Sequence, residues 1–69
     1  MEIVKIKDEY IKLGQALKLS GLVSSGVEAK IVIQGGEVTL NGKVETQRGK
    51  KLHNGDVVFY NGETIQISQ

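Results

Sequence analysis

The chain has 69 residues and a formal net charge of +1, with 39% hydrophobic and 25% charged residues. This length fits one small domain, residues 1–69, and the composition excludes a disordered chain. The absence of cysteine excludes disulfides and thiolate metal sites, and no apolar run approaches the ~20 residues needed to span a membrane.

The N-terminal segment "EIVKIK" alternates weakly and predicts an edge strand with Val4 and Ile6 on one face. Charges interrupt its apolar residues, so it does not resemble a signal peptide, and we expect a cytoplasmic protein. The next segment, "YIKLGQALKLSGL", predicts a helix that stops near Gly21. The i, i+3, i+4, i+7 spacing of one packing stripe is supplied by Leu13, Ala16, Leu17 and Ser20.

The segment "SSGVEAKIVIQGGE" is ambiguous. Ser24 or Ser25 could cap a helix, and Glu28 at the third helical position after Ser25 completes a capping-box pattern. The β-branched run "KIVI" suits a strand equally well. The residues alone therefore do not decide between helix and strand, and Gly35-Gly36 ends the element in either case.

The C-terminal half contains two predicted hairpins. Alternating runs flank Asn41-Gly42 and Asn61-Gly62, and Asn-Gly pairs suit the positive φ angles of a type I′ turn. Asn54-Gly55 predicts a third turn. The loop "TQRGKKLHNG" is expected to join the two hairpins.

Positive charge gathers around that loop. Four basic residues fall within nine positions, opposed only by Glu45: Lys43, Arg48, Lys50 and Lys51. A basic loop is often only solvated surface, so charge alone does not establish an anionic partner. The single histidine, His53, makes a metal cluster improbable, and no nucleophile accompanies it for catalysis. Tyr10 and Tyr60 are expected to be packing residues.

Several short motifs occur in an order that resembles the S-four RNA-binding domain. The matching pieces are Lys12-Leu13, Ser20-Gly21-Leu22, Ser25, Glu28-Ala29, Gly36, Val38, Leu40-Asn41-Gly42 and Gly55-Asp56. The resemblance covers residues 12–58 and looks most like the small stand-alone bacterial YaaA and YbcJ group. It implies an α+β fold, in which two packed helices precede a small, mostly antiparallel sheet. Residues 25–34 are then helical, and the N-terminal strand and C-terminal hairpin are additions to the motif.

The resemblance also implies a non-catalytic protein that binds structured RNA, ribosomal RNA or a ribosome-assembly intermediate, without cofactor, metal or membrane partner. Recognition of this kind relies on phosphate contacts and on RNA shape. The expected RNA-binding residues are Lys12, Ser25, Lys30, Lys43, Arg48, Lys50 and Lys51. We expect the loop and helix charges to form one patch.

The second predicted helix departs from the family pattern. Gly26, Ile31 and Gln34 stand where the family often has further Arg or Lys, which leaves a protein-interaction module as the alternative function. Val27 and Ile31 fall on the same side of this helix as Lys30. Either the added terminal strands cover them, which we expect, or they form a small apolar contact with a protein or a base. With no long apolar surface in view, we expect a monomer.

Overall fold

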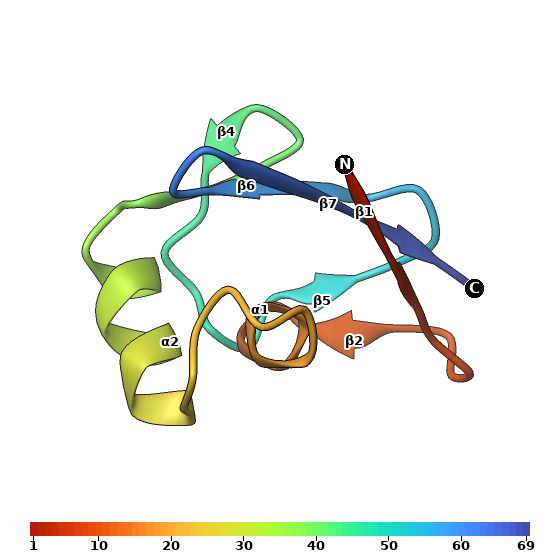
Figure 1. Ribbon diagram of the computed structural model, residues 1–69, viewed down its shortest axis with the longest axis horizontal. Coiled ribbons are helices and arrows are strands. Elements are labelled where there is room, and N and C mark those ends of the chain that lie inside the picture. Colours follow the sequence, from red (N-terminus) through yellow and green to blue (C-terminus); the bar gives the residue numbers. More distant parts are fainter.

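The computed structural model covers residues 1–69 and shows a five-stranded sheet above two helices and a short two-stranded ribbon (Figure 1). The elements in chain order are β1 Glu2–Lys5, β2 Ile11–Lys12, α1 Leu13–Leu19, α2 Gly26–Gln34, β3 Val38–Leu40, β4 Lys43–Val44, β5 Lys51–Leu52, β6 Val57–Tyr60 and β7 Glu63–Ser68. The strand order is β1-β7-β6-β3-β4 in the sheet, and β2 pairs with β5 in the ribbon. The predicted α+β architecture is confirmed.

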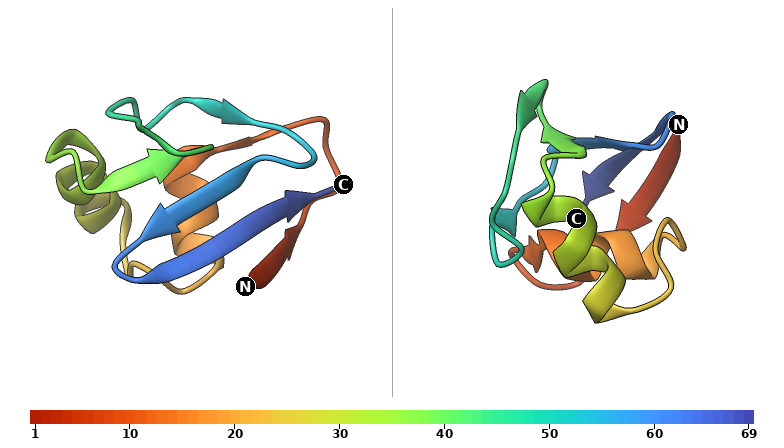
Figure 2. Two further views of the ribbon diagram at one scale, coloured as in Figure 1. Left: turned by 90° about the horizontal axis from the view of Figure 1, so that it is seen from above. Right: turned by 90° about the vertical axis from the view of Figure 1, so that its left-hand side faces the viewer.

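The N-terminal strand β1 and the C-terminal strand β7 pair with each other in the sheet. β1 pairs with β7 in parallel, with Val4 opposite Ile67, and both side chains are buried. All other strand pairs are antiparallel. β1 is therefore the edge strand that the sequence predicts, and Figure 2 shows it beside β7 along one border of the sheet.

One hydrophobic core holds the layers together. Thirteen buried side chains form a single cluster: Val4, Leu13, Ala16, Leu17, Val23, Ala29, Val32, Ile33, Val38, Leu52, Val58, Ile65 and Ile67. Removing such side chains from water is the main favourable contribution to folding.

No helix of the chain has the length and hydropathy needed to cross a bilayer.

Helix α1 ends through a glycine-dependent cap. Gly21 has a φ of +80°, its N–H donates to Lys18 O at 3.0 Å, and Leu22 N–H donates to Leu17 O at 3.1 Å. This pair of bonds is the Schellman arrangement, which a left-handed glycine allows without strain. The predicted stop is confirmed, and the predicted stripe is buried except for the half-buried Ser20.

Helix α2 forms despite its β-branched residues because one face packs into the core and its N-terminus is capped. The Ser25 hydroxyl accepts a hydrogen bond from Glu28 N–H at 3.1 Å. The Glu28 carboxylate accepts from Ser24, at 2.7 Å from the backbone N–H and 3.0 Å from the hydroxyl. One arm of the predicted capping box is therefore present, while the other goes to Ser24 instead of Ser25.

The prediction that the terminal strands cover Val27 and Ile31 is wrong. Their side chains are 69% and 62% exposed. The terminal strands β1 and β7 belong to the sheet, while α2 lies at the opposite end of the molecule from β1 (Figure 1). The added strands extend the sheet and leave this face of α2 open to solvent.

Both Asn-Gly hairpins are confirmed. Asn41 and Gly42 have φ angles of +52° and +86°, and Asn61 and Gly62 have +52° and +80°, as type I′ turns require. In the third turn only Gly55 has a positive φ, so its geometry differs. The segment between the hairpins is more ordered than predicted, because β5 lies within it and Leu52 is fully buried.

The bonds from Ser24 hold the pKa of the Glu28 carboxyl below its ordinary value of 4.5, the backbone N–H contributing most. A lowered folded-state pKa means that the carboxylate stabilises the fold above pH 4.5 and loses this effect as pH falls through the lowered value. We therefore expect Glu28→Gln to reduce the melting temperature near neutral pH and to match the parent in strong acid. Thermal unfolding from about pH 2 to about pH 7 measures this.

Glu63→Gln is the matched control for Glu28→Gln, because Glu63 is exposed and its carboxylate has no hydrogen-bond partner. A melting-temperature difference for Glu28→Gln that stayed constant across the pH range would contradict the role assigned to Ser24.

Candidate nucleic-acid interface

The outer face of the β2–β5 ribbon brings two lysines together. Ile11 lies opposite Leu52, and Lys12 lies opposite Lys51. Leu52 is buried and Ile11 packs against the core, so the alternate residues Lys12 and Lys51 face away from it. Like charges directly opposite each other destabilise a strand pair, and an anion bound between them would remove this repulsion.

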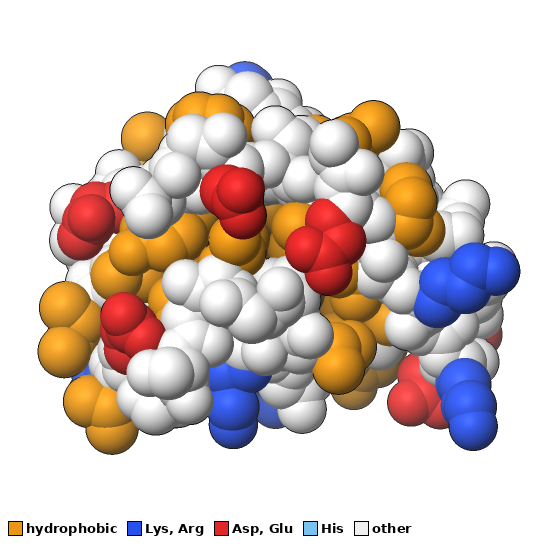
Figure 3. Space-filling view, in the orientation of Figure 1, with side chains coloured by type: hydrophobic (Ala, Val, Ile, Leu, Met, Phe, Trp, Pro, Cys, Tyr) orange, Lys and Arg blue, Asp and Glu red, His pale blue; other side chains and the backbone are white.

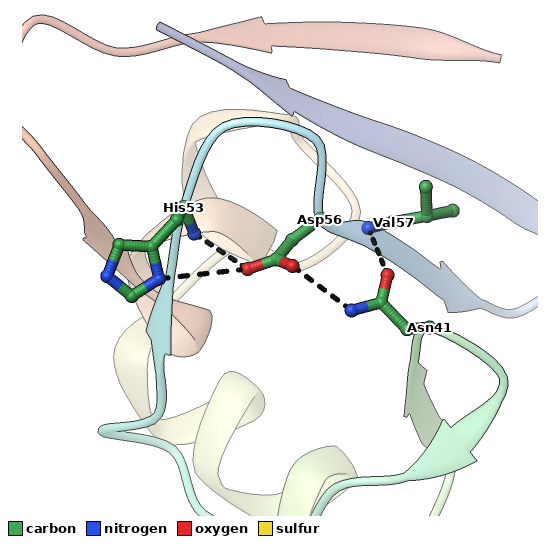
Figure 4. Close-up of polar contacts among 4 residues, drawn as sticks. All are labelled: Asn41, His53, Asp56 and Val57. Carbon is green, nitrogen blue, oxygen red and sulfur yellow. Dashed lines mark hydrogen bonds and ion pairs between the residues drawn. The ribbon is translucent and has the colours of Figure 1, made fainter.

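Hydrogen bonds around Asn41 and Asp56 close the base of the segment that carries four of the nine Lys and Arg residues (Figure 4). The Asn41 side-chain nitrogen donates to Asp56 Oδ1 at 3.0 Å, and His53 N–H donates to Asp56 Oδ2 at 2.7 Å. Asn41 also pairs with Val57: its Oδ1 accepts from Val57 N–H at 2.9 Å, and its N–H donates to Val57 O at 2.7 Å. We call these four residues the loop clamp; it ties the Asn41-Gly42 turn to the Asn54-Gly55 turn.

The clamped loop is also bonded to the start of α1. Leu13 N–H donates to Lys50 O at 2.9 Å, and Gly14 N–H donates to Arg48 O at 3.0 Å. These two donors belong to the first turn of the helix, where no intrahelical acceptor exists. The loop carbonyl groups therefore accept hydrogen bonds from the free N–H groups at the start of α1. The same bonds hold the loop against the helix.

Arg48 lies directly against Gly14. A Cβ atom at Gly14 would be 2.6 Å from Arg48 Cγ, which is closer than side chains approach, and 3.2 Å from Arg48 Cδ. An alanine at this position would therefore displace the Arg48 side chain. The Glu45 carboxylate accepts from Gln47 N–H at 3.1 Å, and so helps to shape the loop without forming an ion pair with Arg48.

The basic side chains line two neighbouring hollows. The first lies among α1, α2 and the loop; its charged residues are Lys12, Lys18 and Arg48, with no carboxylate. The second contains Lys43, Lys50 and Lys51, together with Glu45, His53 and Asp56. The cross-strand pair of Lys12 and Lys51 connects them.

The remaining two expected residues are Lys30 on α2 and Ser25, which immediately precedes this helix. Lys30 is exposed and four positions after Gly26, which lines the first hollow, so both fall on the same side of the helix. Ser25 caps α2 through its hydroxyl oxygen. It stands immediately before Gly26 and so lies near the same hollow.

None of the nine Lys and Arg side chains forms an ion pair. The one pair within 4.0 Å joins His53 Nδ1 to Asp56 Oδ2. In Figure 3 carboxylates are spread across one face, while Lys and Arg side chains lie near its margins. The Lys and Arg side chains therefore have no carboxylate partner within 4.0 Å.

Two residues beyond the expected RNA-binding set also lie in this region. Lys18 is a wall of the first hollow because it is four residues after Gly14 and shares its side of α1. Tyr10 is 39% exposed and lies outside the core cluster, whereas Tyr60 packs against that cluster as expected. The sequence offered only the i, i+4 spacing for Lys18 and no signal for Tyr10.

Comparisons with known proteins give a consistent result. The family model of the S4 domain matches residues 4–68. YbcJ of Escherichia coli strain K12 is 38% identical over 61 residues, covering 88% of this chain and 87% of that protein. A Bacillus subtilis strain 168 protein named "Probable ribosome maturation protein RlbA" is 42% identical over 59 residues, covering 86% of this chain and 83% of that protein.

Two solved structures share the fold. The solution structure of Escherichia coli YbcJ, described as revealing an ALFAL motif involved in RNA binding, matches with a TM-score of 0.77 and 34% identity, covering 100% of this chain and 89% of that one. The 30S ribosomal protein S4e of Thermoplasma acidophilum matches with a TM-score of 0.63 and 27% identity. That match covers 84% of this chain and 31% of the ribosomal protein.

The loop clamp predicts a stability defect with a local signature. Asp56→Ala removes the acceptor for two hydrogen bonds and should lower the free energy of unfolding by about 1–3 kcal/mol. Amide exchange should accelerate most in residues 45–52, because their anchorage is lost. Urea denaturation and hydrogen exchange measure the two effects.

Asp8→Ala serves as the control for Asp56→Ala, since Asp8 is exposed and its carboxylate has no hydrogen-bond partner. Equal losses of stability in the two variants would show that the clamp does not hold the loop.

Proposed function

Because the chain belongs to the S4 domain family, we propose that it is a non-catalytic protein that binds structured RNA, with ribosomal RNA or a ribosome-assembly intermediate as its target. The observation that carries the proposal is the first hollow. There Arg48 is laid over Gly14 beside Lys12 and Lys18, with no carboxylate nearby. Such a surface attracts a polyanion.

Each basic side chain has a distinct role in the proposed complex. The Arg48 guanidinium can take one phosphate through two parallel hydrogen bonds, while a lysine acts as a point charge. Lys12 and Lys51 hold a phosphate between them, which removes their mutual repulsion. The loop clamp fixes the backbone that carries Arg48 and Lys51 before RNA arrives, so little backbone entropy is lost on binding.

The nature of the RNA is proposed from the relatives. One is named for ribosome maturation, and a structural neighbour is a protein of the 30S ribosomal subunit. We place this chain on ribosomal RNA or its precursors, in the cytoplasm and as a monomer. A catalytic role has little support, since the Asp56 carboxylate beside His53 is already bonded by His53 N–H and by Asn41.

A second candidate function is a protein-interaction module on the same fold. The exposed Val27 and Ile31 on α2 favour it. The two functions respond differently to salt: phosphate binding releases counterions and weakens steeply as salt rises, whereas an apolar protein contact does not.

We expect Arg48→Ala/Lys50→Ala/Lys51→Ala to weaken binding to structured RNA in general. With about four to six phosphates contacted, log affinity against log salt should have a slope of roughly −3 to −5 in the parent. The triple variant should reduce the size of this slope by about 1 per charge removed. Titration of a fluorescent ribosomal RNA fragment at several salt concentrations measures both quantities.

The control is Arg48→Lys/Lys50→Arg/Lys51→Arg, which changes the same three side chains and keeps their positive charges. Its slope should stay closer to that of the parent. The loop would be ordinary solvated surface if the triple variant bound as tightly as the parent with the same slope. Stability should change by no more than about 0.5 kcal/mol for each exposed substitution.

The contact between Gly14 and Arg48 gives a sharper prediction. Gly14→Ala keeps every charge but forces Arg48 off α1, because the new Cβ would lie 2.6 Å from Arg48 Cγ. RNA affinity should fall nearly as far as in Arg48→Ala, and the two changes combined should cost little more than either one. Competition binding at one salt concentration measures this.

Gly26→Ala is the matched control for Gly14→Ala. Gly26 is also helical and lines the same hollow, yet a Cβ there meets no atom within 4 Å. It should bind RNA like the parent. Undiminished binding by Gly14→Ala would mean that the position of Arg48 is unimportant.

A further inference from the structure

A third hollow adjoins the proposed interface and has a different character. It lies between the end of β1, the turn into β2 and α1, and its walls include the apolar side chains of Ile6, Tyr10 and Leu19. Lys5, Lys7 and Lys18 also line it, against a single carboxylate, that of Asp8. An apolar floor with a positive rim suits a flat aromatic group attached to phosphate.

Tyr10 is held in position at this hollow without being buried. Lys51 Nζ lies 4.7 Å from the centre of the Tyr10 ring, a cation–π distance. The His53 ring lies across the ribbon, with its centroid 6.4 Å from that of Tyr10 and its plane tilted by 52°. Tyr10 is 39% exposed as a residue, which leaves part of its surface open to a further planar partner.

The third hollow and the first share part of their walls. Lys18 and Gln15 line both. The Gln15 side-chain oxygen accepts from Lys12 N–H at 3.2 Å, which leaves its amide nitrogen as a donor without a partner in the protein. An RNA strand whose phosphates contact Lys12 and Arg48 in the first hollow would therefore pass the free amide nitrogen of Gln15 before it reaches Tyr10.

We propose that this third hollow binds one unpaired base of the RNA, stacked on Tyr10 and contacted at its edge by the Gln15 amide. The proposal rests on the RNA-binding function proposed above and deepens it. Proteins read RNA chiefly at bulges, loops and ends, where unstacked bases meet aromatic side chains. The target is thus a helix interrupted by an unpaired nucleotide, with flanking phosphates on Lys12, Lys18 and Arg48.

The test uses two RNA hairpins that differ by one nucleotide. The first carries a single-nucleotide bulge of 2-aminopurine, whose fluorescence is quenched on stacking, and the second is fully paired. The parent protein should prefer the bulged hairpin and quench its fluorescence. Tyr10→Leu should lose affinity for the bulged hairpin by about 5- to 100-fold, the range for one stacked base, with little change for the paired one.

Two control variants separate stacking from folding. Tyr10→Phe keeps the ring and should keep both the preference and the quenching. Tyr60→Phe alters the other tyrosine, which packs against the core, and should bind like the parent. Gln15→Leu should keep the quenching but reduce the preference, because only the edge contact is lost.

The possible outcomes distinguish a failure of the base site from a failure of the proposed RNA-binding function. Equal binding of both hairpins by the parent overturns the base site while leaving phosphate binding intact. A bulge preference that survives in Tyr10→Leu also overturns it. If the parent binds neither hairpin at any salt concentration, the RNA-binding function itself fails.

Discussion

The hydrogen bond between Asn41 and Asp56 joins residues 15 positions apart and fixes the geometry on which the proposed interface depends. Asn41 sits in a left-handed turn conformation, which asparagine tolerates better than most residues, and its side chain then reaches both Asp56 and Val57. The segment between the two turns becomes a closed loop. The loop loses its conformational entropy during folding, so its ordering does not weaken the binding of RNA.

The same arrangement concentrates charge at a cost to the fold. Lys12 and Lys51 face each other across a two-stranded ribbon, and no carboxylate is paired with either one. Repulsion between exposed charges is weak and screened by salt, so the fold tolerates it. A bound phosphate would turn this unfavourable contact into a favourable one.

Local signals predicted part of this structure and not the rest. The Asn-Gly turns and the Gly21 stop were predictable because each depends on the φ angles of one or two residues. Helix α2 needed the family resemblance, since "KIVI" suits two conformations. Strand β5 was missed because it has two residues and pairs with β2 far away in sequence. No local pattern could place Arg48 over Gly14, because that contact depends on how the loop folds back onto α1.

The departure of α2 from the family pattern has a structural counterpart on α1. Gly26 stands where the family often carries a basic residue, and it leaves open space in the first hollow. Lys18 lines that hollow from α1, so α1 supplies positive charge at a wall where α2 contributes Gly26 and Ala29. Lys18 also lines the hollow beside Tyr10, which no α2 side chain does. The positive surface therefore extends along α1 towards the exposed Tyr10, while Val27 and Ile31 on α2 are exposed apolar side chains.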